Sequence, residues 1–320
     1  MFIAQAYKGD NTPWKVIVTI LITSGIFILN LVAFLISDPG DMEQAYALLK
    51  KIPKNLSLIL NLAPFALLLI LLFLLVKYLH ERSILSLTTS RSKVDFSRIF
   101  FGFAMVFIFT VVSFIIGYFI EPEAYELQFK PLNFIILVVI SLVLFPFQIG
   151  LEEYLFRGFL MQQIGIALKN RWMPLIITSV LFGVFHSANP EVAELGPIVM
   201  IFYIGTGLLL GIMTLMDEGM ELALGFHLGN NFLAATLVTA EYSALQTDAI
   251  FKSVGEPATL SELILPVFVV YPIFLFIMAK KYKWNHWKEK LTGKVIKPPH
   301  FTSTMNYKGI IPPKNIITED

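Results

Sequence analysis

Long apolar runs alternate with short polar segments along most of this chain. A run of about 18 or more apolar residues is long enough to cross a bilayer as a helix. A helix also satisfies its own backbone hydrogen bonds, as the bilayer core requires. The pattern therefore predicts an all-α, polytopic transmembrane helical bundle with about eight spanning helices. The expected spans are 14–37, 57–78, 97–120, 131–168, 173–187, 197–216, 220–240 and 261–280.

The fourth run, 131–168, is too long for one simple crossing. At about 1.5 Å per residue it would extend about 57 Å, nearly twice the thickness of the hydrocarbon core. Pro146 and Gly150 lie within this run. A proline inside a helix removes a backbone hydrogen bond, so we expect a kink near these two residues.

The composition agrees with a membrane protein, since 56% of the residues are hydrophobic and 15% are charged. Soluble domains carry about 25% charged residues. The chain has no cysteine, which excludes disulfides, thiolate chemistry and cysteine-based metal sites. The net charge is +1, and the basic and acidic residues are divided among different loops instead of gathering on one face, so we expect no nucleic-acid partner. The sequence has no phosphate-binding loop, so we expect no nucleotide partner either.

Basic residues concentrate in two polar segments, the loop 77–98 and the tail after residue 280. This bias places both segments in the cytoplasm. Three loops that are acidic or poor in basic residues should lie outside: 121–126, 191–194 and 241–256. The loop with Lys50, Lys51 and Lys54 is an exception to this pattern.

The chain divides into three expected parts. Residues 1–125 hold N-terminal transmembrane helices, residues 126–285 form a core that contains the intramembrane polar groups, and residues 286–320 form a polar tail. The tail is expected to be disordered and cytoplasmic. The first apolar run is too long for a signal peptide, so we expect it to be retained. With no organelle signal, a bacterial cytoplasmic membrane is the expected location.

Two adjacent acids, Glu152 and Glu153, lie inside a strongly apolar run. An ionisable group inside a bilayer is costly, which makes it a candidate functional residue. Arg157 follows Glu153 by four residues, on the same helix face and in the favourable acid-first order, so we predict an ion pair. Glu152 has no such partner. It could bond to another helix, be exposed at the membrane edge, or act as a general base favoured by desolvation.

Two histidines, His186 and His227, also lie inside apolar segments. His227 shares a helix face with Asn231. Each could be a simple packing residue, and Gly225 and Gly229 form a small-xxx-small pattern that lets another helix approach closely. Both interpretations can hold together, because close packing of helices brings polar side chains into one site. The remaining histidines lie in basic loops or the tail and are expected to be solvated: His80, His286 and His300.

A short polar turn at 169–172 predicts that the segments on either side form a helical hairpin. Residues at equal distances from the tip then face each other, which brings Glu152 close to His186. His227 would lie at a similar depth in the next hairpin. The chain from 187 to 196 must then return to the outer face in partly irregular form. Such backbone is tolerated only against protein or a water-filled cavity.

A buried glutamate, two histidines and an asparagine suit hydrolysis by an activated water. Two histidines and a carboxylate could instead bind zinc with one open position. No H-E-x-x-H pattern occurs on one helix, which argues against a zincin-like site. A transporter with Glu152 as proton relay would predict polar groups in two repeated halves. Here they lie in the second half alone.

Three blocks of residues stand out in this second half: Glu152-Glu153-x-x-x-Arg157, Phe182-x-x-x-His186 and His227-x-x-x-Asn231. In this order and inside apolar segments, they resemble the three motifs of the CAAX prenyl endopeptidase and bacteriocin-processing (CPBP, or Abi) family of intramembrane proteases. The resemblance covers roughly residues 130–240 and makes the part 126–285 the expected protease core.

The resemblance implies an eight-helix membrane protease with a catalytic site in a cavity open to the cytosol. Glu152 would activate water with help from His186, while His227 and Asn231 would bind the oxyanion. The family is also described as metal-dependent. This makes Glu152, His186 and His227 candidate ligands of a metal such as zinc.

Glu153 and Arg157 would be supporting residues, in agreement with the ion pair predicted from their spacing. The resemblance implies a peptide or protein substrate, which is prenylated in some members of the family. It also implies that the protein is surrounded by membrane lipid. The alternative is a non-catalytic relative that acts as a bacteriocin-immunity or membrane scaffold protein.

Overall fold

The computed structural model describes residues 1–37, 51–255 and 259–299, and it confirms an all-α membrane bundle with little sheet. The N-terminal helices are α1 (Pro13–Thr23), α2 (Gly25–Ile36), α4 (Lys54–Leu74) with a π-helical extension η2 (Leu75–Leu79), α5 (Leu85–Thr88) and α6 (Phe96–Ile120). The central helices are α7 (Pro131–Glu153), the π-helical η4 (Tyr154–Leu160), α8 (Met161–Leu168), α9 (Trp172–Val184) and α10 (Pro190–Leu195).

The remaining helices are α11 (Met200–Asp217), α12 (Glu221–Thr236), α13 (Leu260–Leu265), the π-helical η6 (Pro266–Val270), α14 (Tyr271–Tyr282) and α15 (Trp287–Thr292). Short 3-10 turns lie at η1 (Ile3–Lys8), η3 (Pro122–Ala124) and η5 (Pro197–Val199). Three short strands, β1 (Tyr125–Leu127), β2 (Val238–Thr239) and β3 (Phe251–Ser253), form a sheet in the order β1-β3-β2. β3 pairs antiparallel with β1 and parallel with β2.

The number of long spans differs from the expected eight. In the described part of the chain, five helical stretches are long and apolar enough to cross a bilayer, or six if α1 and α2 count as one bent span. α9 has 13 residues and α12 has 16. Both are shorter than the roughly 18 residues that a simple crossing needs, so neither is among the long spans.

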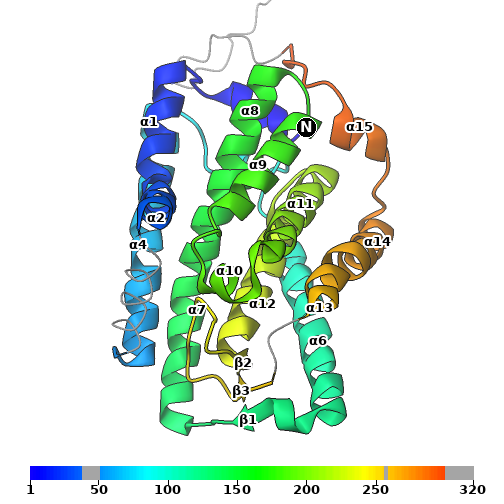
Figure 1. Cartoon of the computed structure of the whole chain (residues 1–320). Coiled ribbons are helices and arrows are strands. Elements are labelled where there is room, and N and C mark those ends of the chain that lie inside the picture. Colours follow the sequence, from blue (N-terminus) through cyan, green and yellow to red (C-terminus); the bar gives the residue numbers. More distant parts are fainter. Residues whose placement is uncertain (38–50, 256–258, 300–320) are drawn as a thin grey trace, which may run out of the picture.

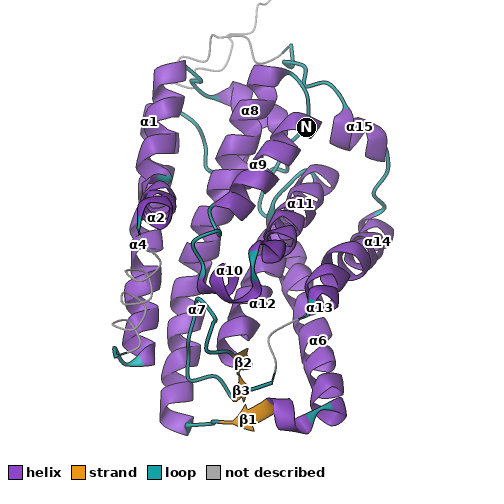
Figure 2. Ribbon diagram, viewed as in Figure 1, coloured by secondary structure: helices purple, strands orange, loops and turns teal. Residues whose placement is uncertain are grey.

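The bundle has three parts from side to side. In Figure 1, α1, α2 and α4 lie at the left, α6, α13 and α14 at the right, and α7 with α8, α9, α11 and α12 between them. The strands gather at the lower end of the molecule (Figure 2), and α15 lies at the opposite end with the N-terminus. The first expected span, 14–37, is broken between α1 and α2 by a 63° bend.

Glycines let α6 and α12 approach closely, as the pattern of small residues predicts. A Cβ on Gly225 would overlap the backbone carbonyl of Ile99, and one on Gly229 would lie 3.0 Å from the carbonyl oxygen of Phe103. From the other side, a Cβ on Gly102 would overlap the carbonyl of Leu222. The two backbones are therefore in contact along the face of α12 next to His227.

The basic residue that broke the expected charge pattern has a local partner. Lys54 Nζ lies 3.7 Å from Asp248 Oδ1, in the loop that leads to β3. Lys130 Nζ lies 3.8 Å from the same oxygen, and Asn133 Nδ2 donates to Asp248 Oδ2 at 2.8 Å. Lys54 therefore belongs to the contacts that attach this loop to the starts of α4 and α7.

Two expectations about polar segments are corrected. His80 is 1% exposed rather than solvated. Its Nδ1 bonds the carbonyl oxygen of Asp10 at 2.7 Å, and its Nε2 lies 2.9 Å from Thr19 Oγ1. The tail was expected to be disordered from residue 286, yet residues 287–292 form α15. His286 is exposed as expected, and His300 lies outside the described residues.

Candidate functional site

The two acids lie at the last turn of α7, where the helix changes its winding. The chain from Pro131 to Leu168 forms one helical stretch of 38 residues. Within it, Tyr154–Leu160 is π-helical and begins directly after Glu153. π-helical turns in α-helices occur frequently at functional sites, because they turn side chains away from the regular positions. The irregularity follows the acidic pair rather than Pro146, where we expected it.

The predicted ion pair between Glu153 and Arg157 is present and fully buried. Arg157 Nη1 donates to Glu153 Oε1 at 2.8 Å, and both side chains are 0% exposed. Arg157 Nη2 donates to the carbonyl oxygen of Gly207 on α11 at 3.1 Å. The guanidinium also lies over the ring of Phe182, 4.5 Å from its centroid. The guanidinium of Arg157 thus contacts residues of three helices, α7, α9 and α11.

His227 lies between the two acids. Its Nδ1 is 2.9 Å from Glu153 Oε1, the oxygen that also binds Arg157. Its Nε2 lies 3.6 Å from Glu152 Oε2. Glu153 therefore has a second role that the sequence did not reveal, because it orients the ring of His227 as well as neutralising Arg157.

Glu152 reaches Asn231 through a residue that the sequence analysis missed. Gln148 Nε2 donates to Glu152 Oε1 at 2.5 Å, and Asn231 Nδ2 donates to Gln148 Oε1 at 3.0 Å. Glu152 is 3% exposed, and its Oε2 is buried without a hydrogen-bond partner in the described residues. A signal for Gln148 was available, since it lies one helical turn before Glu152 on the same face of an apolar helix.

His186 lies just beyond the end of α9 and joins the site through aromatic contacts. Its Nδ1 is 2.7 Å from the carbonyl oxygen of Phe182. The ring of Phe182 lies 4.5 Å from the ring of His186 and 6.0 Å from that of His227, between centroids. The structure thus brings the predicted residues of α7, α9 and α12 to one region of the bundle.

The segment after His186 has the irregular form that the sequence predicts. It makes successive turns to Asn189 and then one short helix, α10. Its end at Gly196 has a positive φ of 79°, which glycine adopts without strain. The segment packs against α11 and against the loop after α12, since Glu191 Oε1 accepts the backbone N–H of Ala244 at 2.7 Å.

The arrangement was tested for a metal site. In the described ranges, no group of three or more His, Asp or Glu side chains is placed to hold a metal ion. Nδ1 of His186 is engaged by a carbonyl oxygen, and Nδ1 of His227 by Glu153. Groups that hold Nδ1 in this way also orient histidines that bind a metal through Nε2, so the ligand set of Glu152, His186 and His227 stays a prediction.

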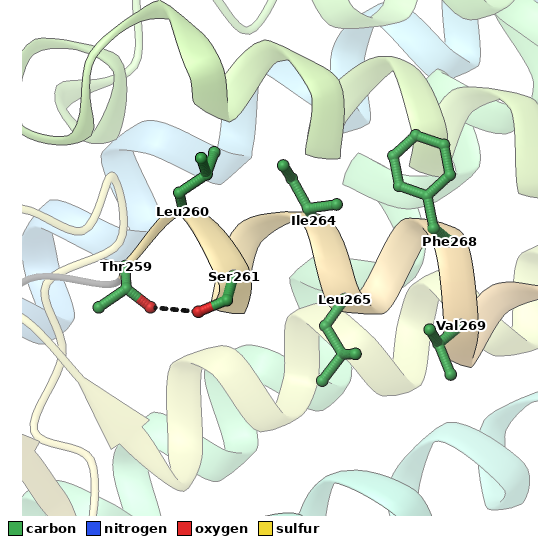
Figure 3. Close-up of a pocket in the computed structure, with 7 residues that line it drawn as sticks. All are labelled: Thr259, Leu260, Ser261, Ile264, Leu265, Phe268 and Val269. Atoms are coloured by element: carbon green, nitrogen blue, oxygen red, sulfur yellow. Dashed lines mark hydrogen bonds between the residues drawn. The ribbon is translucent and has the colours of Figure 1, made fainter.

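An open hollow of about 560 Å³ lies along α13 and η6, apart from these residues. In Figure 3 its apolar side chains, among them Leu260 and Phe268, project from the helix, and Thr259 bonds Ser261 at one end. The hollow lies on one of the long apolar spans, so its lining suits contact with lipid chains.

Comparisons with known proteins agree with the position of the site. Residues 131–233 match the family model described as type II CAAX prenyl endopeptidase Rce1-like. The uncharacterized protein YyaK of Bacillus subtilis (strain 168) is 31% identical over 247 residues, which cover 74% of this chain and 81% of that protein. No solved structure matches the chain. The segment matched by the family model contains every residue of the site, from Gln148 to Asn231.

Proposed function

This chain belongs to the Rce1-like family of type II CAAX prenyl endopeptidases, and on that premise we propose that Glu152 activates a water for peptide-bond hydrolysis within the membrane. The observation that carries the proposal is the state of Glu152. Gln148 fixes one carboxylate oxygen. The other, Oε2, is buried without a hydrogen bond to any described residue and lies 3.6 Å from Nε2 of His227. A buried acceptor that lacks a hydrogen bond is costly, and a bound water would satisfy it.

The reaction follows from this atom. A water on Glu152 Oε2 gives its proton to the carboxylate while its oxygen bonds to the carbonyl carbon of the substrate. The carbonyl oxygen takes the negative charge. When the carbon–nitrogen bond breaks, the leaving nitrogen takes the proton back from Glu152. In this proposal His186 assists the proton transfer.

His227 and Asn231 are the proposed donors to the oxyanion. His227 has Nδ1 on Glu153, so its Nε2 must carry a second proton to donate. Two carboxylates flank this ring, and Arg157 pairs with one of them. The amide of Asn231 has two hydrogens, and Gln148 uses one of them. No step in this scheme uses a metal.

The substrate class is a peptide or protein segment that reaches a site inside the membrane. Lipidated and unmodified peptides are both candidates, and the family description, which names prenyl substrates, supports testing prenylated ones. We propose that the bacterial cytoplasmic membrane is the location and that the site opens toward the cytosol. The basic loops support this orientation, since they lie near the end of the bundle that carries α15.

The test is cleavage of a library of prenylated and unmodified peptides by purified protein in detergent. Glu152→Gln should lower kcat by about 10²- to 10⁴-fold, as expected for loss of a general base. The control is Glu194→Gln, because Glu194 is exposed on α10 and should leave the rate unchanged. A parallel arm with a chelator tests for metal.

Two outcomes would overturn the proposal. A folded wild-type protein that cleaves no peptide would favour the non-catalytic scaffold alternative. Full activity in Glu152→Gln, with activity abolished in a folded Glu153→Gln variant, would exchange the roles of the two acids.

A further inference from the structure

His186 lies outside any helix, yet its ring is held on two sides. It follows the last residue of α9, in a run of turns where the backbone alone does not fix the direction of a side chain. The carbonyl oxygen of Phe182 can only accept a hydrogen bond, so Nδ1 of His186 carries the proton at 2.7 Å. Nε2 is then the basic nitrogen of a neutral ring.

Tyr203 of α11 covers one face of this ring. The two rings stack with centroids 4.6 Å apart and an angle of 28° between their planes. Phe182 lies near the ring as well, at 4.5 Å and an angle of 39°. The imidazole is therefore enclosed by two aromatic side chains from different helices, which limits rotation about its side-chain bonds.

Asn189 forms hydrogen bonds with both Tyr203 and His186. Its Nδ2 donates to the hydroxyl oxygen of Tyr203 at 3.1 Å. Its backbone N–H donates to the carbonyl oxygen of His186 at 3.0 Å. One residue thus holds the backbone of His186 and also the ring that stacks on its side chain. Tyr203 and Asn189 both lie outside the three sequence blocks, and they contact those blocks at His186.

We propose that Tyr203, held by Asn189, is a positioning residue that fixes His186 as the Nδ1–H tautomer with Nε2 free to accept a proton. Groups that orient a functional histidine through its other face or nitrogen typically change activity 10- to 100-fold when they are removed. The inference rests on the proposed function for its role in catalysis. The ring orientation itself can be tested without cleavage.

The first measurement is the ¹⁵N spectrum of histidine-labelled protein at pH 7.5, with the His186 signal assigned from its loss in His186→Asn. Wild type and Tyr203→Phe, which keeps the ring, should show the Nδ1–H tautomer. Tyr203→Leu, which removes the stack, should show a mixture of tautomers. The matched control is Tyr271→Leu, because Tyr271 is also buried on a helix and its hydroxyl bonds Thr206 at 2.8 Å.

The second measurement uses a cleaved peptide from the library. Tyr203→Leu should lower kcat by about 10- to 100-fold with little change in KM, and Tyr203→Phe should restore most of the rate. An unchanged His186 tautomer in a folded Tyr203→Leu variant would overturn the inference. If wild type cleaves no peptide, the proposed function fails, and the tautomer comparison alone decides whether Tyr203 positions His186.

Discussion

A single carboxylate oxygen, Glu153 Oε1, is shared by Arg157 and His227 in the middle of the bundle. Removing one partner of a buried ion pair leaves an uncompensated charge and typically costs about 3–5 kcal/mol. Glu152 differs because its oxygens have separate environments: Oε1 bonds the amide of Gln148, and Oε2 has no hydrogen bond within the described part of the chain. Two adjacent residues of the same type therefore have different chemistry, since their side chains leave the helix in different directions.

Gln148→Leu should lower kcat of the peptidase by about 10- to 100-fold, because Glu152 Oε1 and Asn231 lose the group that orients both. The measurement is kcat and KM on a peptide cleaved by wild type. Gln163→Leu is the control, since Gln163 is 7% exposed and bonds Asn11 rather than a site residue. A Gln148→Leu variant as active as Gln163→Leu would remove Gln148 from the site.

His80 should make the stability of the protein depend on pH. Burial lowers the pKa of this imidazole below its ordinary value of 6.5, and the nearby charge of Arg82 adds to the effect. The unfolded chain takes up a proton as the pH falls through about 6.5, while the folded protein resists it. The contribution of His80 is therefore present above this pH and is lost as the pH falls through the folded pKa, at up to about 1.4 kcal/mol per pH unit.

Thermal unfolding in detergent between pH 7.5 and 5 measures this effect. The unfolding temperature of wild type should fall as the pH is lowered, and His80→Gln should flatten part of that fall. His286→Gln is the control, because His286 is exposed and should leave the slope unchanged. Identical slopes in all three proteins would contradict the assignment to His80.

At the scale of the elements, the contact between α6 and α12 determines where His227 lies. His227 is flanked by Gly225 and Gly229, and each of these glycines meets the backbone of α6. A side chain at either position would push the helices apart and move the histidine with them.

Gly225→Ala should destabilise the protein by about 1–3 kcal/mol, because its Cβ would overlap the carbonyl of Ile99. The unfolding temperature in detergent measures the change. Gly25→Ala is the matched control, since a Cβ there meets nothing within 4 Å. It should be neutral or slightly stabilising, because alanine favours a helix more than glycine does. Equal effects of the two substitutions would argue against close contact of α6 and α12.

At the scale of the whole molecule, each end of the bundle has its own set of ion pairs. The end with α15 carries a network in which Arg91 binds Asp217 at 2.7 Å and Glu221 at 3.0 Å. The opposite end carries the small sheet, with Glu126 in β1 and the loop that Asp248 attaches to Lys54. The proposed orientation therefore rests on the basic residues of the loop 77–98 and of the tail.

Single cysteines can test that orientation, because the natural chain has none. Lys93→Cys and Glu123→Cys change exposed residues near opposite ends of α6. A membrane-impermeant maleimide should label Glu123→Cys in intact cells and Lys93→Cys only after permeabilisation, since basic loops stay in the cytoplasm. The reverse pattern would invert the topology and place the basic loops outside.

The pattern of residues was enough to predict part of the site. The spacing of Glu153 and Arg157 identified the ion pair, because neighbours four apart on a helix meet wherever that helix forms. The small residues at Gly225 and Gly229 indicated a close helix contact for the same local reason. Gln148 was missed although it lies one turn before Glu152 on the same helix face. Tyr203 was missed because its partners, Asn189 and His186, lie on another segment of the chain.

The sequence by itself determined the helical membrane class, the blocks of polar residues and their family resemblance, because hydrophobicity and helical spacing are local properties. Only the tertiary structure decided that Glu153 orients His227, that Gln148 joins Glu152 to Asn231 and that His80 is buried. It also decided the lengths of the spans and the π-helical turn after the acids. These features depend on contacts between segments far apart in the chain. Such contacts leave no repeating pattern of residues from which they could be predicted.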